Sequence, residues 1–243
     1  MAYANYTFVK PNPTDGNDSE LAYWVAATVH NTVIEQREYA EQDHMAAPPL
    51  HLNILLSNFN TENSRSSGST PLWNKCNVLA AELPTLQAFV EYFIAEPSLI
   101  AAPMGTLVDI LKKETDISIN YLANHYDYNC ELTSAVVKSL AYHELGHASH
   151  YSQVGCNFWY TYRSSIASEI FLGNGSTKPY GDGTEPNAGI IAVGEMWGWT
   201  IEHIYTDRHY GDGGATGPLA TGGFTSLLQG TYWLNYHIFL LLV

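Results

Sequence analysis

Basic residues are scarce in this chain of 243 residues, which has 10 Lys and Arg against 24 Asp and Glu. The formal net charge is −14 at pH 7, and the isoelectric point lies near 4.9. A protein that binds nucleic acid or an anionic membrane surface needs a basic patch, and no segment of this sequence provides one. We therefore expect neither as a partner.

Long apolar segments and cysteines are also few. The apolar stretch 238–243 is far shorter than the roughly 20 residues of a membrane-spanning helix, so we expect a buried terminal segment and no membrane span. Cys76, Cys130 and Cys156 form neither a CxxC pair nor a zinc-ribbon spacing. A helix predicted over 133–154 would hold Cys130 and Cys156 about 33 Å apart, which excludes a disulfide between them.

The composition is that of a folded globular protein. Hydrophobic residues make up 46% of the chain and aromatic residues 13%, whereas charged residues make up only 14%. The length suits a single domain over 1–243. Within it we expect an N-terminal part, 1–130, with a helix and short strands, and a helical C-terminal part, 131–243.

Periodic patterns predict the main elements. Apolar residues recur every three or four positions over 20–42, which predicts an amphipathic helix, and a second helical pattern covers 78–95. Alternating patterns predict strands at 50–57 and at 116–121, the second with one solvent-exposed face. From residue 131 the pattern is mostly helical. Strands early and helices late indicate a helix-rich α+β fold.

Residues 142–151 read YHELGHASHY and contain an HExxH motif. On a helix, residues i and i+4 project from one face a turn apart, so the imidazoles of His143 and His147 can share one zinc ion. Glu144 lies near the same cleft without being a ligand. It can take a proton from the attacking water and pass it to the leaving amine.

The surrounding sequence places this motif in the middle of a helix. The pattern over 133–154 begins with Thr133 or Ser134 as a cap and ends at Gly155. This context disfavours the alternative that two structural histidines align by chance.

A catalytic zinc site needs one more protein ligand than two histidines supply. His150 lies about 10 Å along the helix axis from His143, so it cannot complete the site and is expected beside it. Three later glutamates are candidates: Glu169, Glu195 and Glu202.

Glu195 is the favoured third ligand, ahead of Glu169. Its segment, AGIIAVGEMWGWTIEHIY, has the better helical pattern, and Gly194 and Gly198 flank it on adjacent turns. Glycines let one helix approach another closely, which a short carboxylate needs in order to reach a metal held by a second helix. Glu202, two turns further on, would then support a ligand or face solvent.

HELGH on one helix and GEMWGW on a later one resemble the gluzincin branch of the zincin metallopeptidases, enzymes related in design to thermolysin and neprilysin. The stretch YHELGHASHY with a later Gly-Glu-x-Trp also resembles zinc-binding metallopeptidases of Bacteroidetes-type bacteria, which are usually exported or lipid-anchored. The resemblance covers residues 131–205. It implies a zincin-like domain, one Zn²⁺ per chain held by His143, His147 and Glu195, and Glu144 as the catalytic residue. It also implies a peptide or protein substrate and an extracytoplasmic location, whether secreted, periplasmic or surface-anchored.

The sequence departs from the gluzincin pattern at Trp199. Thermolysin- and neprilysin-like enzymes have an acidic residue there, four positions after the ligand glutamate, where it supports a zinc-bound histidine. In this chain the supporting carboxylate must come from elsewhere. The residue that stabilises the oxyanion stays open among Tyr180, Tyr205, His209 and Tyr210.

We therefore expect zinc-dependent hydrolysis of peptide bonds with Glu144 as the general base. One alternative is a non-catalytic, zinc-containing module at the cell surface or associated with glycans, which the weakly charged, Tyr- and Trp-rich composition would also suit. Another is a zinc hydrolase that acts on a non-peptide bond. The intact Glu144 favours an enzyme, because a purely structural site needs no base.

Overall fold

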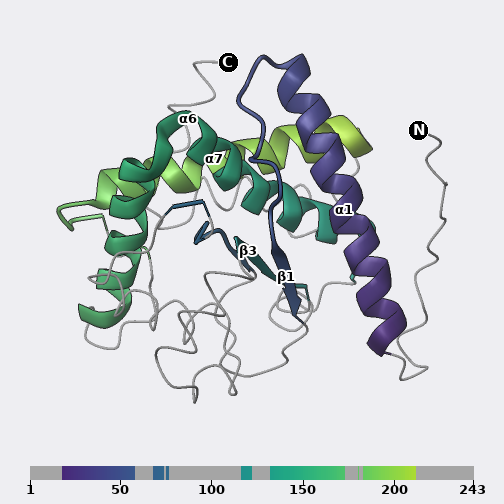
Figure 1. Ribbon diagram of the computed structural model, residues 1–243, viewed down its shortest axis with the longest axis horizontal. Coiled ribbons are helices and arrows are strands. Elements are labelled where there is room, and N and C mark those ends of the chain that lie inside the picture. Colours follow the sequence, from purple (N-terminus) through teal and green to yellow (C-terminus); the bar gives the residue numbers. More distant parts are fainter. Residues whose placement is uncertain are drawn as a thin grey trace.

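The computed structural model describes residues 18–57, 68–73, 75–76, 116–121, 132–172, 180 and 183–211. This part of the chain contains three helices and three short strands (Figure 1). In chain order they are α1 (Asp18–Gln42), β1 (Ile54–Ser57), β2 (Gly68–Ser69), β3 (Ile117–Asn120), α6 (Ser134–Leu172) and α7 (Ala188–Tyr210). The expected helix-rich α+β class is confirmed in this coarse form.

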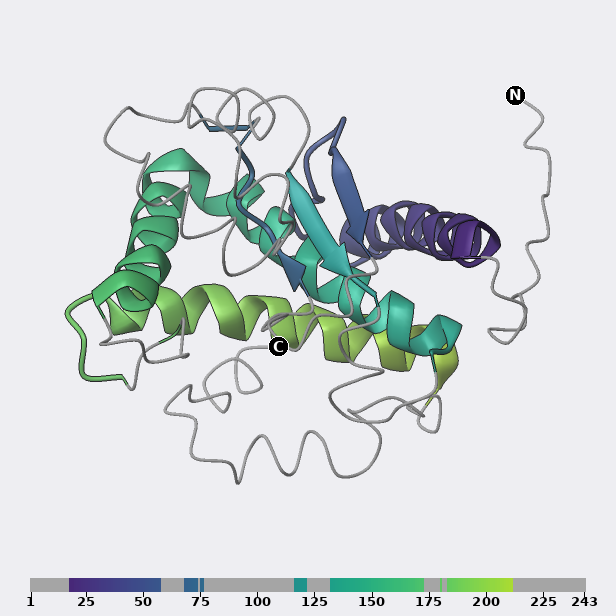
Figure 2. The same ribbon diagram turned by 90° about the horizontal axis from the view of Figure 1, so that it is seen from below.

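The two long C-terminal helices, α6 and α7, lie side by side, and α1 packs against α6 (Figures 1 and 2). The small sheet packs against α6 through β2 and β3. None of the helices in the described ranges is both long and apolar enough to cross a membrane.

The buried face of α1 follows the spacing that predicted a helix over 20–42. Trp24, Val25, Thr28 and Thr32 are all buried. The hydroxyls of Thr28 and Thr32 donate to the carbonyl oxygens four residues earlier, at 2.9 and 2.8 Å. These polar side chains therefore enter the core with their hydrogen bonds satisfied.

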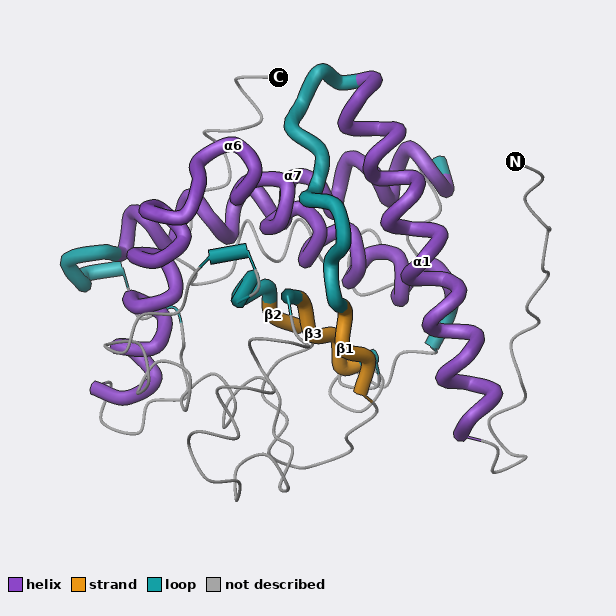
Figure 3. Tube along the Cα trace, viewed as in Figure 1, coloured by secondary structure: helices purple, strands orange, loops and turns teal. Residues whose placement is uncertain are grey.

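The sheet has the strand order β1-β3-β2 (Figure 3). β1 runs parallel to β3, with Ile54 opposite Ile117, and β2 runs antiparallel to β3, with Gly68 opposite Ile119. β1 confirms the second half of the strand predicted at 50–57. The helix predicted over 78–95 and the C-terminal stretch 238–243 lie outside the described residues.

β3 is the central strand, and all four of its residues are buried. Ile117 and Ile119 belong to the hydrophobic core. The hydroxyl of Ser118, on the opposite face, lies 2.7 Å from the hydroxyl of Ser69. The prediction of a solvent-exposed face is therefore wrong, because the polar residues Ser118 and Asn120 are both buried.

Gly155 divides α6 into two helical segments that meet at a kink (Figure 2). Its backbone has φ 75° and ψ −177°, in the positive-φ region that glycine tolerates best. The predicted start of the first segment is confirmed at Thr133, whose hydroxyl accepts a hydrogen bond from the Val136 amide at 3.3 Å. The predicted stop at Gly155 is confirmed as a break, but a second helical segment follows at once.

A disulfide links Cys76 to Cys156, with the two Cα atoms 5.6 Å apart. It attaches the segment that follows β2 to the first residue after the kink. Cys156 is therefore not available to Cys130, in agreement with the exclusion of that pair.

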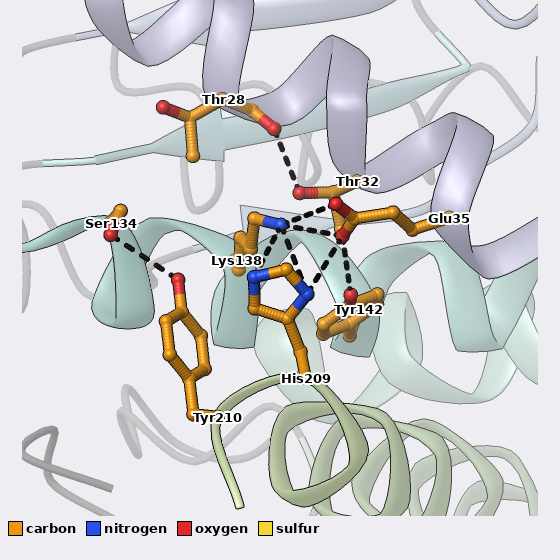
Figure 4. A network of polar contacts seen from close by, with 8 residues as sticks. All are labelled: Thr28, Thr32, Glu35, Ser134, Lys138, Tyr142, His209 and Tyr210. Carbon is orange, nitrogen blue, oxygen red and sulfur yellow. Dashed lines mark hydrogen bonds and ion pairs between the residues drawn. The ribbon is translucent and has the colours of Figure 1, made fainter. Parts of the chain in front are cut away.

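A polar network centred on Glu35 ties α1 to both C-terminal helices (Figure 4). The ammonium of Lys138 lies 2.7 and 2.5 Å from the two carboxylate oxygens of Glu35. The hydroxyl of Tyr142 donates to the same carboxylate at 2.8 Å, and His209 of α7 lies 3.1 Å from the Lys138 ammonium. Lys138 is buried, so Glu35 supplies the opposite charge that a buried ammonium group needs.

Replacing Glu35 with alanine should destabilise the protein. Because Glu35→Ala leaves the buried Lys138 without its carboxylate, we expect the free energy of unfolding to fall by about 2 kcal/mol. The loss is smaller than for a fully buried pair, since the Glu35 side chain is 24% exposed. Urea denaturation measures it. The control is Glu38→Ala, on the exposed side of α1, which should change stability by less than about 0.5 kcal/mol; equal losses in both variants would contradict the role of the network.

Candidate metal centre

Two glycines set how closely α6 and α7 approach each other at the HExxH motif. A Cβ added to Gly146 would lie 3.1 Å from the Cα of Gly198. A Cβ added to Gly198 would lie 2.9 Å from Cε1 of His147 and 3.1 Å from Cε1 of His143. The two helices therefore meet backbone to backbone, and the imidazoles occupy the space that a side chain at position 198 would fill.

This approach brings together the three side chains that the sequence nominated as metal ligands. The Nε2 atoms of His143 and His147 lie 3.1 Å apart. The carboxylate of Glu195 places Oε2 3.7 Å from Nε2 of His143 and Oε1 3.8 Å from Nε2 of His147. The potential ligand atoms all lie within 4.8 Å of one another, which is close enough to bind one metal ion.

The donor set fits a zinc ion. Ligand atoms at about 2.0–2.1 Å from a tetrahedral zinc lie about 3.3 Å from one another. The observed separations of 3.1, 3.7 and 3.8 Å bracket this value. Two imidazoles and one carboxylate are also the ligands of one common kind of catalytic zinc site. Among the described residues, Glu169 belongs to no group able to hold a metal ion.

Glu202 is the acidic partner of His143. In the gluzincin pattern this role belongs to an acidic residue at the position where this chain has Trp199. Its Oε2 lies 3.1 Å from Nδ1 of His143, and its Oε1 accepts a hydrogen bond from the hydroxyl of Ser139. When the His143 ring is neutral, as a metal ligand must be, an Nδ1 proton directed at Glu202 leaves the Nε2 lone pair toward Glu195 and His147. Trp199 instead packs edge-on against the His143 ring, with ring centroids 5.1 Å apart.

Glu144 is buried beside this group and is held by the segment that follows β2. The hydroxyl of Thr70 lies 2.6 Å from Oε2 of Glu144, to which it donates, and 2.9 Å from the Glu144 carbonyl oxygen. Burial raises the pKa of Glu144 to about 7, against the opposing effects of the His143 charge and the Thr70 hydrogen bond. A carboxyl group with a pKa near neutrality is suited to both accepting and returning a proton.

The protonation of the two histidines follows from their surroundings. Burial lowers the pKa of His147 to about 3, so this imidazole stays neutral and able to ligate. Burial acts on His143 in the same direction, but the Glu195 and Glu202 carboxylates outweigh it and raise the pKa of His143 above its ordinary value. Protons therefore compete with a metal ion for this site as the pH falls.

Tyr162 is part of the site and was not among the sequence candidates. Its hydroxyl donates to Oε1 of Glu195, and its ring centroid lies 6.0 Å from that of His147. A Cβ at Gly194 would lie 2.5 Å from the Tyr162 ring, so this glycine makes room for it. The sequence shows Gly194 directly before Glu195, but the contact of Gly194 with Tyr162 depends on the kink at Gly155.

Three of the four residues considered for the oxyanion lie away from these ligands. Tyr205 packs between Tyr39 and Tyr142, whereas His209 belongs to the Glu35 network. The hydroxyl of Tyr210 lies 3.2 Å from that of Ser134, and only Tyr180 lines the pocket at the site.

His150 lies beside the site, as expected from its distance along the helix. It is buried and stacks on Trp197, with ring centroids 5.3 Å apart and planes inclined by 19°.

A small pocket gives access to the group. Its lining includes residues 68–70, Tyr162 and Ile166 together with Glu144 and the three potential ligands. Carboxylates, imidazoles and a phenol therefore line a single space together with residues of β2.

Comparisons of the chain with protein-family models, with curated proteins and with solved structures find no match.

Adding one methyl group between the helices should damage the metal site. Because the Cβ of Gly198→Ala would meet both imidazoles, we expect zinc affinity to fall by about tenfold or more, together with the thermal unfolding temperature. Gly189→Ala on the same helix is the control, since a Cβ there meets nothing within 4 Å. It should preserve zinc affinity and stabilise α7 by up to about 1 kcal/mol. Unchanged affinity in Gly198→Ala would show that the close approach is not required.

Proposed function

We propose that this protein is a zinc-dependent metallopeptidase of the gluzincin type. The observation that carries the proposal is the convergence of two imidazole Nε2 atoms and one carboxylate on a pocket that the buried carboxyl group of Glu144 also lines. A purely structural site has no use for such a base, whereas hydrolysis requires one.

In this proposal, His143, His147 and Glu195 hold the ion, and Glu202 orients His143. Bound zinc supplies a Lewis acid that polarises the substrate carbonyl and lowers the pKa of the attacking water. Glu144 takes a proton from that water at a carboxylate oxygen and gives it to the departing amine nitrogen.

We propose a peptide or protein as the substrate, because an HExxH motif on a helix with a further carboxylate ligand is typical of zinc peptidases. Gly68 of β2 lies directly against Glu144, since a Cβ there would overlap the carboxylate. The main chain of β2 therefore lies beside the proposed base.

We further propose an extracytoplasmic location. The support is the disulfide between Cys76 and Cys156, because disulfides form and persist mainly in oxidising compartments.

The third ligand can be tested by two matched substitutions. Glu195→Ala should weaken zinc binding by about a hundredfold or more, because it removes one of three protein donors. Glu169→Ala, on the second segment of α6, should leave zinc affinity within about threefold of wild type. Competition with a chromophoric chelator measures both. The opposite pattern would assign the ligand to Glu169.

Glu144→Gln separates an enzyme from a protein that only stores zinc. The substitution is nearly isosteric and is not at a ligand, so we expect the fold and the zinc content to be preserved. The amide cannot accept the proton, so hydrolysis of a peptide library should fall by about 10²–10⁴-fold. The measurement compares initial rates at equal zinc occupancy, with a chelator-treated sample as the blank. A glutamine variant that cleaves at the wild-type rate would refute the mechanism, and a zinc-loaded wild type that cleaves nothing would favour a non-catalytic module.

A further inference from the structure

Both carboxylate oxygens of Glu195 approach a histidine, but only one of them accepts a hydrogen bond from Tyr162. Oε2 lies 3.7 Å from Nε2 of His143, and Oε1 lies 3.8 Å from Nε2 of His147. Oε1 also accepts the hydrogen bond of the Tyr162 hydroxyl. Glu195 is 2% exposed, so water cannot satisfy an oxygen that the protein leaves unpaired. The phenol therefore distinguishes two oxygens that otherwise lie at nearly equal distances from the two imidazoles.

Tyr162 reaches this position only because α6 is kinked. In a straight helix, 15 residues would separate Tyr162 from His147 by about 22 Å along the axis. The break at Gly155 folds the second segment back, and the two rings lie with their centroids 6.0 Å apart. The ring of Trp159, 4.9 Å from that of Tyr162 between centroids, packs against it.

We propose that Tyr162 is a positioning residue that occupies one oxygen of Glu195 and so restricts this ligand to a single oxygen on the metal. The proposal rests on the metal centre described above and deepens the proposed function. With one atom from each of His143, His147 and Glu195, the protein supplies three donors, and a fourth position stays open for water or substrate. With both Glu195 oxygens on the ion, that position would be lost or crowded.

The test uses the full-length protein loaded to saturation with Co²⁺, whose visible absorption is stronger in four-coordinate than in five-coordinate sites. Tyr162→Phe frees Oε1 of Glu195, so we expect about one more donor atom on the metal and a loss of absorption intensity relative to wild type. The control is Tyr151→Phe. Tyr151 also packs against Trp159, but its hydroxyl donates to the Lys75 carbonyl oxygen, at 3.1 Å. The absorption spectrum of Co²⁺-loaded Tyr151→Phe should therefore match that of wild type.

A second measurement needs no variant. X-ray absorption at the zinc edge of the zinc-loaded wild-type protein should show one Glu195 oxygen on the metal, without the short metal–carbon distance of a bidentate carboxylate. A bidentate Glu195 in wild type, or a Tyr162→Phe spectrum that matches wild type, would overturn the proposal. Failure of wild type to bind either metal would overturn it together with the metal centre. Absence of peptide cleavage, with both metal signatures as expected, would refute the peptidase and leave the role of Tyr162 standing.

Discussion

The contact between Gly146 of α6 and Gly198 of α7 is the constraint on which the site depends. Any side chain at position 198 would occupy the space of the two imidazoles. Because neither helix has a side chain at this crossing, the Glu195 carboxylate reaches His143 and His147 from the neighbouring helix. The geometry of three potential ligands therefore follows from backbone proximity, which packing elsewhere along the two helices maintains.

Local features of the fold could be predicted from the sequence, whereas long-range attachments could not. Periodicity predicted the first helix, and a glycine stop signal predicted the end of a helix at Gly155, because both depend on neighbouring residues. Residues 68–73, 75 and 76 are held by attachments of the second kind. These are the Cys76–Cys156 disulfide and the hydrogen bonds from Trp159 and Arg163 to the carbonyl oxygens of Thr70 and Pro71. These attachments place Thr70 against Glu144, and no short-range pattern signals them.

The same division holds for the candidate site. The HExxH spacing is a local helical signal, so it nominated His143 and His147 directly, and the glycines around Glu195 marked a close helix contact. Glu202 was foreseen only as a supporting or exposed residue, because its role depends on the rotation of α7 toward His143. Tyr162 was missed, since a straight helix would carry it far from the ligands. The sequence therefore nominated the three candidate ligands, which the structure brings together, but not the residues that support them.

The central claim is that His143, His147 and Glu195 hold one zinc ion. Crystals of the zinc-loaded protein, measured on both sides of the zinc absorption edge, test it most directly. The account predicts a single strong anomalous peak within about 2.0–2.2 Å of Nε2 of both histidines and an oxygen of Glu195, with one zinc per chain by elemental analysis. No anomalous peak between these side chains, or a peak coordinated by other residues, would contradict it.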